Sequence, residues 1–425
     1  MTLSEAMASL SDYGRSVDSL APLRDSRFRW LFVGRTVSMF GSSLVNIALA
    51  FAVLDISNSP GALGAVLAAH TIPMALLMLF GGVVADRFPR GRVLLISHLA
   101  SGASQACAAT LFISGHATVS NIIGIEAING IVSAFTFPAL QGVIPTVVDR
   151  SILQQANALL SFARGAAMIV GPSAGALVVV TAGAGWALAF DALTYLVAAV
   201  CMGRLRISMS LRPASSSMLH ELRAGWGEFA SREWLWVIVL AFGFLNALNG
   251  LAWITLGPVI AKVTVGVGSW GVVLSADTVG FFVMTLLLLR IRLRHPLRAG
   301  MIGVALVAAP MLILGLSPSL FPLIASSFVA GAGSEVFSIG WQTALQEHVP
   351  GEMLSRVASY DMLGSVVAIP VGQLLAGPLT AVFDSRAVVV ASSLLYVLVV
   401  GAAILSPSVR NLQRVALPTP AAGEI

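Results

Sequence analysis

Four of the charged side chains within the long apolar runs of this 425-residue sequence stand out. The acids are Glu126 and Glu335, and the bases are Arg35 and Arg164. A charge inside a membrane is costly unless it is paired or neutralised, so such residues commonly mark proton, ion or substrate sites. A carboxyl that releases and regains a proton in that setting suits proton coupling. We therefore take these four residues as the proton-coupling candidates.

An ionised Glu126 calls for a cation nearby. Arg35 and Arg164 are the only bases inside the apolar runs, and we expect Arg164 to be the partner. The alternative for Glu126 and for Glu335 is a place near a helix end, where water or a hydrogen bond satisfies the carboxyl.

Other ionisable residues in or beside the apolar runs are weaker candidates. Asp55 and Asp191 fall near the ends of predicted helices, where we expect water to solvate them. His70 is expected to be a packed or pore-edge residue, with a proton relay as the alternative. Asp277 and Asp361 are further carboxyls inside helices, and Asp361 also fits a structural feature of its own segment.

The rest of the chain must place these side chains within a membrane. Hydrophobic residues make up 57% of the sequence and charged residues 10%, with a mean hydropathy of +0.91. So little polar material cannot cover a soluble globule, and about 20 apolar residues cross a bilayer as a helix. The runs are too long and too continuously apolar for barrel strands. The sequence predicts an all-α membrane protein with twelve transmembrane helices, over residues 29–54, 61–84, 92–115, 119–143, 153–181, 184–203, 234–261, 268–289, 297–316, 319–345, 354–381 and 385–406.

The basic residues predict the orientation, because Lys and Arg are retained on the cytoplasmic side. Only Lys262 and Arg386 fall in loops of the other side, so both termini are predicted to be cytoplasmic. This excess accounts for the isoelectric point near 9.9, and no basic stripe with interleaved aromatics indicates nucleic-acid binding. The composition suits a bacterial genome, and we expect a multi-pass protein of the bacterial cytoplasmic (inner) membrane.

The longest polar interruption divides the chain into halves of six helices. Within it, Met218–Trp234 reads as an amphipathic helix on the inner leaflet, with Leu222, Trp226 and Phe229 on one face. The predicted segments are a cytoplasmic N-terminal arm, a six-helix bundle, a cytoplasmic linker, a second six-helix bundle and a cytoplasmic tail, at 1–27, 28–203, 204–233, 234–406 and 407–425.

An internal repeat supports the division into halves. Pro138–Gly175 resembles Gln342–Gly372, since both contain Ala-Leu-Gln, then a Pro, a short loop and a helix broken by Pro. Parallel halves of this kind suit a transporter that binds its substrate between them. The repeat aligns Glu335 with Gly130, about one turn from Glu126, so the two acids are expected to face one cavity.

The junction Gly81–Arg92 directly follows an apolar run and carries Gly82, Asp86, Arg87 and Arg90. This pattern resembles the signature loop of the major facilitator superfamily, although Pro89 and Gly91 replace a usual Gly and a common base. The resemblance covers about residues 28–406 and implies the twelve-helix, two-half major facilitator fold. It also implies that Asp86 contacts the N-terminus of the eleventh helix, near Ser355–Ala358, and stabilises one of two conformations. We expect the four motif residues to form a conformational-switch loop.

Gly171, Pro172 and Gly175 resemble the Gly-Pro-x-x-Gly motif of the antiporter branch of that superfamily, with generic helix packing as the alternative. Further similarity, in Phe137–Pro145 and Leu354–Ser365, is to the macrolide-efflux and enterobactin-exporter type. One departure concerns Glu126, which stands where many proton-driven exporters carry an arginine.

Polar and aromatic residues on the first, fourth, seventh and tenth helices are the expected substrate-cavity candidates. A mostly apolar wall with a few amides and indoles suits a bulky amphipathic ligand better than a sugar. The candidates are Asn46, Asn129, Asn246, Asn249, Trp253 and Trp341.

These features predict a secondary transporter that exports hydrophobic or amphipathic, drug-like small molecules by proton antiport and alternating access. The alternatives are export or import of an endogenous metabolite such as a siderophore or lipid, and a transporter-like sensor that moves nothing. The sequence contains no P-loop and no cluster with metal-ligand spacing, so we expect neither an enzyme nor a cofactor or metal. The expected partners are the substrate, protons and the lipid bilayer, with the chain a monomer. Cys107 and Cys201 are expected to be packing residues.

Overall fold

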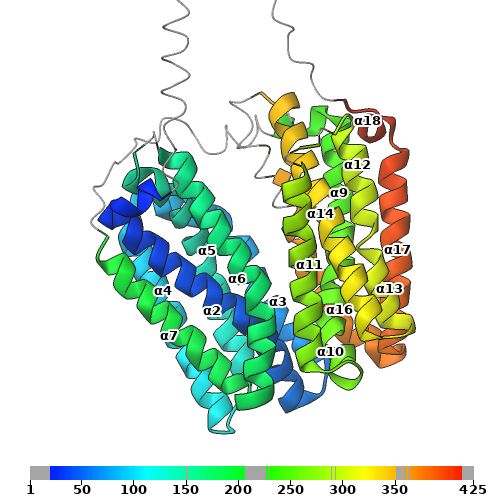
Figure 1. The fold of residues 1–425 in the computed structure, drawn as a ribbon. Coiled ribbons are helices and arrows are strands. Elements are labelled where there is room, and N and C mark those ends of the chain that lie inside the picture. Colours follow the sequence, from blue (N-terminus) through cyan, green and yellow to red (C-terminus); the bar gives the residue numbers. More distant parts are fainter. Residues whose placement is uncertain are drawn as a thin grey trace, which may run out of the picture.

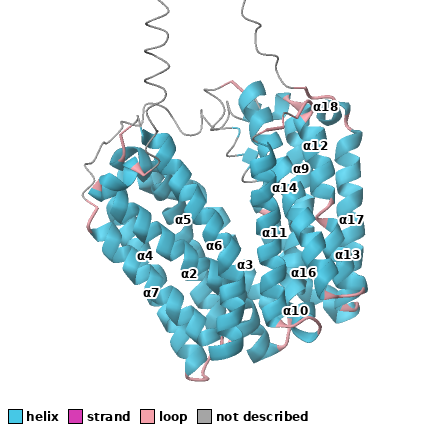
Figure 2. Cartoon of the chain, viewed as in Figure 1, coloured by secondary structure: helices cyan, strands magenta, loops and turns pink. Residues whose placement is uncertain are grey.

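The computed structural model describes residues 20–149, 152–205, 226–227, 229–288, 290–291, 293–350, 357, 360–361 and 364–413. These residues are helical apart from short connections, and no strand occurs among them (Figure 2). Of the predicted linker helix, Leu222 lies outside the described residues. Trp226 and Phe229 are described; their rings stack on each other, and both pack against the ring of Tyr360.

Two groups of long helices lie side by side in Figure 1. The N-terminal half follows the short η1 (Ala21–Arg24) and contains α2 (Ser26–Ser57), α3 (Pro60–Arg87), α4 (Arg90–Ile113), α5 (Val119–Val147), α6 (Leu153–Ala182) and α7 (Ala184–Gly203). The C-terminal half contains α9 (Glu233–Asn249), η3 (Gly250–Thr255), α10 (Leu256–Val263), α11 (Val267–Leu288), α12 (Pro296–Ala305), α13 (Ala308–Leu316), α14 (Leu320–His348), α16 (Ala368–Val382), α17 (Ser385–Leu405) and α18 (Pro407–Arg410).

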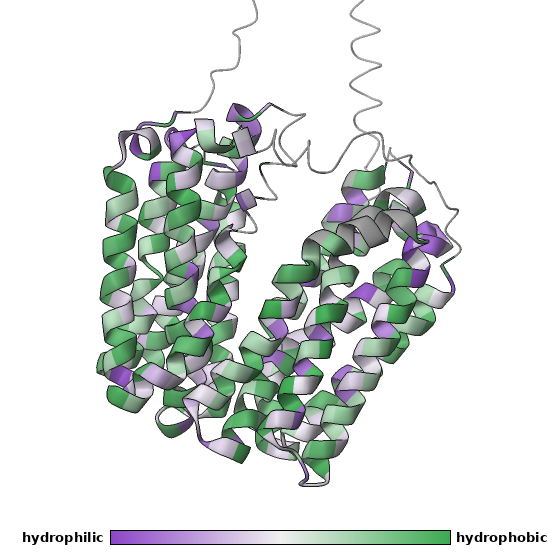
Figure 3. Cartoon of the chain, turned by 180° about the vertical axis from the view of Figure 1, so that it is seen from behind, coloured by the Kyte–Doolittle hydropathy of each residue, from purple (hydrophilic) through white to green (hydrophobic). Residues whose placement is uncertain are grey.

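The end of the molecule where α2 begins and α18 lies is called the terminal end here, and the other is the opposite end. The two groups of helices approach each other at the opposite end and separate toward the terminal end (Figure 1). Hydrophobic residues cover the helices along most of their length, and hydrophilic residues gather at the terminal end (Figure 3). This distribution is that of a protein surrounded by lipid along its sides.

Local sequence signals set the ends of several helices. Asp25 caps α2 by accepting a hydrogen bond from the Arg27 backbone N–H at 2.8 Å, and Thr118 caps α5 in the same manner. Asn58, the first residue after α2, adopts a left-handed conformation with φ 48°, as is common for a residue that ends a helix.

Eleven helical stretches of the described residues are long and apolar enough to cross a membrane. The twelfth predicted span is α4, which is as long as the others but carries more polar residues. Its polar side chains face inward and are buried: Ser97, His98, Ser101, Ser104 and Gln105. The twelve predicted spans therefore agree with the fold, and α4 differs because it buries polar groups within the N-terminal half.

Helices of the C-terminal half are interrupted at three places. The span from Glu233 to Val263 contains the π-helical η3, in which the Thr255 hydroxyl donates to the Gly250 carbonyl at 2.7 Å. The α12 and α13 helices are separated at residues 306–307, four residues before Pro310, whose missing N–H leaves the carbonyl there without its usual partner. A similar turn at Val367 precedes α16, in which Pro370 has the corresponding place.

The halves contact each other through small residues and one charged cluster. At the opposite end, Gly61 of α3 approaches Gly377 of α16, and Lys262 of α10 contacts Asp55 of α2 at 2.8 Å. Lys262 also donates to the Leu54 carbonyl at 2.8 Å and the Asn58 side chain at 3.2 Å. Because these partners belong to the N-terminal half, Lys262 fastens the halves together at that end.

Candidate functional site

A carboxyl and an imidazole meet inside the N-terminal half. Glu126 lies on α5 and is 5% exposed, and its Oε2 is 3.2 Å from Nδ1 of His70 on α3. The His70 side chain is one-third exposed, so this group offers an access route to the buried acid. A carboxyl and an imidazole in contact can hold one shared proton on either group.

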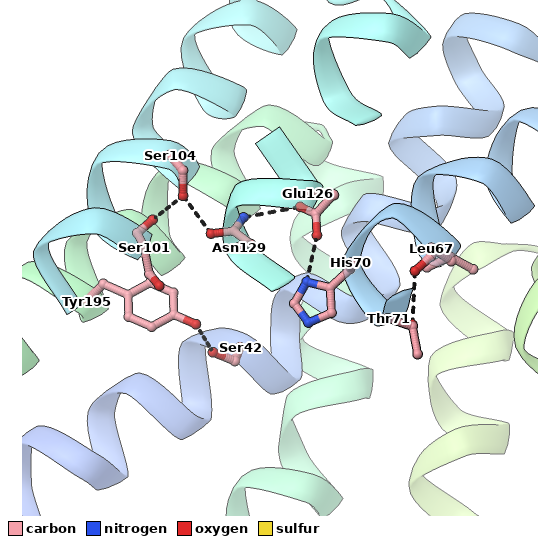
Figure 4. Close-up of polar contacts among 9 residues, drawn as sticks. All are labelled: Ser42, Leu67, His70, Thr71, Ser101, Ser104, Glu126, Asn129 and Tyr195. Atoms are coloured by element: carbon pink, nitrogen blue, oxygen red, sulfur yellow. Dashed lines mark hydrogen bonds and ion pairs between the residues drawn. The ribbon is translucent and has the colours of Figure 1, made fainter. Parts of the chain in front are cut away.

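Amide and hydroxyl groups continue the chain of contacts away from Glu126. Asn129 donates to Glu126 Oε1 at 3.4 Å, and the Ser104 hydroxyl donates to Asn129 Oδ1 at 2.6 Å. Ser104 lies on α4 and also contacts the Ser101 carbonyl at 2.9 Å. Figure 4 shows these groups lying in sequence between α4, α5 and α3. The amide oxygen and nitrogen of Asn129 are thus both used, which fixes its orientation and that of the acid.

Close backbone packing sets the distance between α3 and α5. Gly130 follows Asn129, and a Cβ at this position would collide with the His70 carbonyl oxygen. Only glycine lets the two helices approach so closely at this depth. The residue that permits the approach therefore lies one turn from Glu126 and directly against the backbone of its partner, His70.

The prediction that Glu126 pairs with Arg164 is wrong. Glu126 has His70 as its ionic partner, and Arg164 forms no ion pair with a described residue. The reason is depth, because at about 1.5 Å per residue Glu126 lies ~32 Å along α5 from Val147, while Arg164 lies ~17 Å along α6 from Leu153. Arg164 and Arg35 are instead close enough for their charges to interact.

Further polar groups lie within the same half. The Ser42 hydroxyl of α2 and the Tyr195 hydroxyl of α7 are 3.0 Å apart, and the Tyr195 ring packs against His98 (Figure 4 shows the first contact). Asp191 is 1% exposed and accepts a hydrogen bond from Thr194 at 3.2 Å. The expectation that water solvates Asp191 is therefore wrong, because α2 packs against it through Gly41.

Glu335, the second predicted acid, is bound inside the C-terminal half. It is 4% exposed, and its Oε1 accepts a hydrogen bond from Thr285 of α11 at 2.7 Å. Neither Glu335 nor Glu126 makes a hydrogen bond or ion pair with a described residue of the other half. The two acids are thus held separately, and the expectation that they face one cavity remains a prediction.

The other predicted carboxyls have distinct surroundings. Asp361 accepts a hydrogen bond from the Trp341 indole N–H at 2.9 Å, which ties α14 to the segment before α16. Asp277 of α11 is half-buried beside Gly331, whose missing side chain brings α14 against its backbone. Asp55 is 60% exposed and thus solvated as expected, although it also pairs with Lys262.

The cavity candidates divide by burial and bonding. Asn46 is exposed on α2, whereas Asn129 is buried and bonded to Glu126. Asn246 donates to the Ser365 carbonyl at 2.9 Å, and the ring of Trp253 lies 4.8 Å from that of Trp270. Asn249 is half-buried, and Trp341 is 6% exposed. Asn46 thus keeps its side chain available in this conformation, and Asn246 and Trp341 serve as links between helices.

The predicted switch loop is described only in its backbone and in Arg90. The α3 helix ends at Arg87 and α4 begins at Arg90, so Gly82, Asp86 and Arg87 fall in the last turns of α3. Their side chains, and the expected contact region Ser355–Ala358 apart from Val357, lie outside the described residues.

The Gly171–Gly175 motif lies between three helices. Gly171 packs against Ser43 of α2, and Gly175 packs against the Leu44 backbone. On the other side of α6, the Pro172 carbonyl lies against Gly271 of α11. The motif thus joins α6 to a helix of its own half and to a helix of the other half, where Ser173 and Ser275 share a 2.7 Å hydrogen bond.

Reasoning from the sequence missed or undervalued three features of the interior. His70 was expected to be a packed or pore-edge residue or a proton relay and was not considered as a partner of Glu126. Lys262 was treated only as a loop charge, and Ser104 was not considered. The spacing of Ser97, Ser101 and Ser104 on one helical face is a signal that could have indicated the polar side of α4. Cys201 packs against Gly34 as expected, but Cys107 is exposed on its helix.

Comparisons with known proteins agree with this architecture. The chain is 24% identical to the staphyloferrin A transporter of Staphylococcus aureus, covering 82% of this chain and 88% of the relative. It is 22% identical to the multidrug efflux pump Tap of Mycobacterium tuberculosis, over 88% and 91% of the two chains. It is also 24% identical to the enterobactin exporter EntS of Escherichia coli, over 83% and 85%.

The fold is shared with solved transporters at low sequence identity. The nucleoside transporter NupG aligns with a TM-score of 0.72 and 14% identity, over 89% of this chain and 98% of that one. A bacterial homologue of the iron transporter ferroportin, in an inward-facing state, aligns with a TM-score of 0.67 and 16% identity, over 89% and 98%. Residues 17–322 match the transmembrane secretion effector family, and the chain therefore belongs to this family of major facilitator superfamily transporters.

Proposed function

We propose that this chain exports hydrophobic or amphipathic small molecules by exchange with protons across the bacterial cytoplasmic membrane. In this proposal both termini are cytoplasmic, so the terminal end faces the cytoplasm. The observation that carries the proposal is the buried Glu126–His70 pair, which is oriented by Asn129 and lies within the N-terminal half. A buried acid beside one partly exposed partner can take up or release a proton through that partner, and no other charged group has to move.

The position of His70 supports a link between protonation and movement. His70 lies on α3, the helix that also contacts α16 through Gly61 and Gly64. A proton that changes the His70–Glu126 contact alters how α3 sits against α5, and α3 carries that change to the interface between the halves. Proton binding would then favour one conformation and substrate the other, as alternating access requires.

A metabolite exporter is the second candidate. It is favoured by the printed names of two relatives, a staphyloferrin A transporter and an enterobactin exporter, which match this chain as well as the multidrug pump does. Both candidates use the same proton site, so they differ in substrate and not in coupling.

Dye efflux from cells tests the proposal. Cells expressing the wild type, Glu126→Gln or His70→Gln are loaded with rhodamine 123 or with fluorescein, and efflux is followed with and without a protonophore. The matched control is Asp149→Asn, an exposed acid of the same half. We expect protonophore-sensitive export of at least one dye, lost in Glu126→Gln and retained in Asp149→Asn at equal expression. Export that survives both the protonophore and Glu126→Gln would contradict proton coupling.

A further inference from the structure

Two arginines lie on the neighbouring helices α2 and α6 of the N-terminal half without a counter-charge among the described residues. Arg35 of α2 is 7% exposed, and its Nη1 is buried and makes no hydrogen bond with a described residue. Arg164 of α6 is exposed, and the two charges are near enough to interact. No described carboxyl forms an ion pair with either arginine, and Glu126 contacts His70 instead.

The helix geometry places the two residues at the same depth. Arg164 lies on the same face of α6 as Gly171, seven residues away, and Gly171 packs against Ser43 of α2. Two turns toward the terminal end from Ser43, α2, which runs parallel to α6, carries Thr36 and Arg35. The Thr36 hydroxyl is also buried and makes no hydrogen bond with a described residue. Thr36 and the two arginines therefore lie at about the same depth on the neighbouring helices α2 and α6.

This arrangement is costly as it stands. A buried guanidinium without a partner loses its hydration, and a like charge beside it adds repulsion. An anion removes both costs, and the planar fork of arginine matches the two oxygens of a carboxylate, sulfonate or phosphate. The exposure of Arg164 leaves this place open to a ligand.

We propose that Arg35, Arg164 and Thr36 form a binding site for the anionic group of an amphipathic substrate. The inference rests on the proposed export function and names its substrate class. The two guanidinium groups hold the anion, while the apolar body of the ligand extends from the site. A lipid headgroup carries the same anionic chemistry, so the test must distinguish the two sources.

Equilibrium binding to purified protein in nanodiscs provides the test and needs no proton gradient. The probes are fluorescein and rhodamine 123, which share a xanthene ring system but carry opposite charges, and fluorescence polarisation reports their binding. The variants are Arg35→Gln, Arg164→Gln and Arg35→Lys. The control is Arg29→Gln, which removes an exposed charge from the same helix as Arg35.

We expect fluorescein to bind more tightly than rhodamine 123 in zwitterionic nanodiscs. Arg35→Gln and Arg164→Gln should each weaken fluorescein binding by about tenfold or more, as expected for a lost charge-assisted contact. Arg35→Lys should weaken fluorescein binding less than Arg35→Gln does. Fluorescein affinity in Arg29→Gln, and rhodamine 123 affinity in every variant, should change by less than about twofold. If phosphatidylglycerol in the nanodisc displaces fluorescein from the wild type, the anion that the site holds in the membrane is a lipid headgroup.

Equal fluorescein affinity in the wild type and in Arg164→Gln would contradict the proposed anion site. Arg164 is exposed, so this variant remains informative even if Arg35→Gln does not fold. The outcome is separate from that for proton coupling, because binding is measured at equilibrium without a proton gradient, whereas the dye-efflux test depends on that gradient. Loss of fluorescein binding in Glu126→Gln but not in the arginine variants would also overturn the assignment.

Discussion

The two halves of the molecule share a fold but differ in what their interiors contain. The N-terminal half contains the Glu126–His70 pair and also buries His98 and Asp191. The C-terminal half holds aromatic stacks, such as Phe242 on Phe337 at 4.1 Å. Its buried acid, Glu335, is bonded to a hydroxyl and not to a base.

The halves also differ in how regular their helices are. The N-terminal helices run unbroken over 20 residues or more, from α7 to the 32-residue α2. The C-terminal half has the π-helical η3 and the turns at residues 306–307 and 367. Such interruptions often mark sites of movement. Under the proposed function, proton chemistry would belong to the half with unbroken helices and bending to the half with interrupted ones.

The largest effect is expected where the N-terminal half depends on close packing. Gly130→Ala places a methyl group against the His70 carbonyl, which must push α3 away from α5. We expect a loss of about 1–3 kcal/mol in stability and of most proton-coupled transport. Thermal unfolding of purified protein and dye efflux measure the two effects.

Gly124→Ala on the same helix is the matched control for this change. No atom lies within 4 Å of a Cβ at Gly124, so stability should stay equal or rise slightly. If Gly130→Ala transports as well as Gly124→Ala, the close contact of α3 and α5 is not needed for coupling.

The contact between the halves at the opposite end should have an intermediate effect. Lys262→Gln removes an ion pair to Asp55 and weakens hydrogen bonds to Leu54 and Asn58. We expect the equilibrium between conformations to shift by about 1–2 kcal/mol toward the one that is open at that end. Distances between spin labels on α2 and α10 measure this shift.

Arg386→Gln is the control for the Lys262 variant. Arg386 also donates to backbone carbonyls, those of Gly315 and Leu316, but all within the C-terminal half. Its loss should leave the spin-label distances unchanged. Equal distance changes in both variants would show that Lys262 has no special role between the halves.

The smallest effect is expected in the π-helical segment. Thr255→Val removes the hydroxyl that donates to the Gly250 carbonyl, whereas Thr255→Ser retains it. We expect a loss of about 1 kcal/mol in stability and slower transport, with proton binding unchanged. If Thr255→Val instead abolishes proton binding, the division of roles between the halves is wrong.

The twelve helices could be predicted from the sequence because the length of an apolar run is a local property. The sequence also held the cause of two interruptions: Pro370 is the proline that breaks the helix in the internal repeat, whereas the position of Pro310 was not used. The π-helical segment could not be predicted, because it depends on how Gly250 packs against the Ile369 carbonyl of α16, 2.7 Å from a Cβ placed there.

The candidate site was predicted in part. Glu126 stood out because a carboxyl in an apolar run is rare, and this depends on composition alone. Its partner could not be predicted in the same way, since pairing depends on the depth and facing of residues on separate helices. Arg164 has the stronger charge, but His70 lies at the right depth on the neighbouring helix.

Infrared difference spectroscopy of the purified protein tests the central claim, that the N-terminal half binds the coupling proton at Glu126. Spectra are compared between acidic and alkaline pH for the wild type, Glu126→Gln, His70→Gln and Glu335→Gln, without any substrate. We predict a pH-dependent carboxyl band that disappears in Glu126→Gln, shifts in His70→Gln and stays in Glu335→Gln. A band that persists in Glu126→Gln and disappears in Glu335→Gln would contradict the account and place the proton in the C-terminal half.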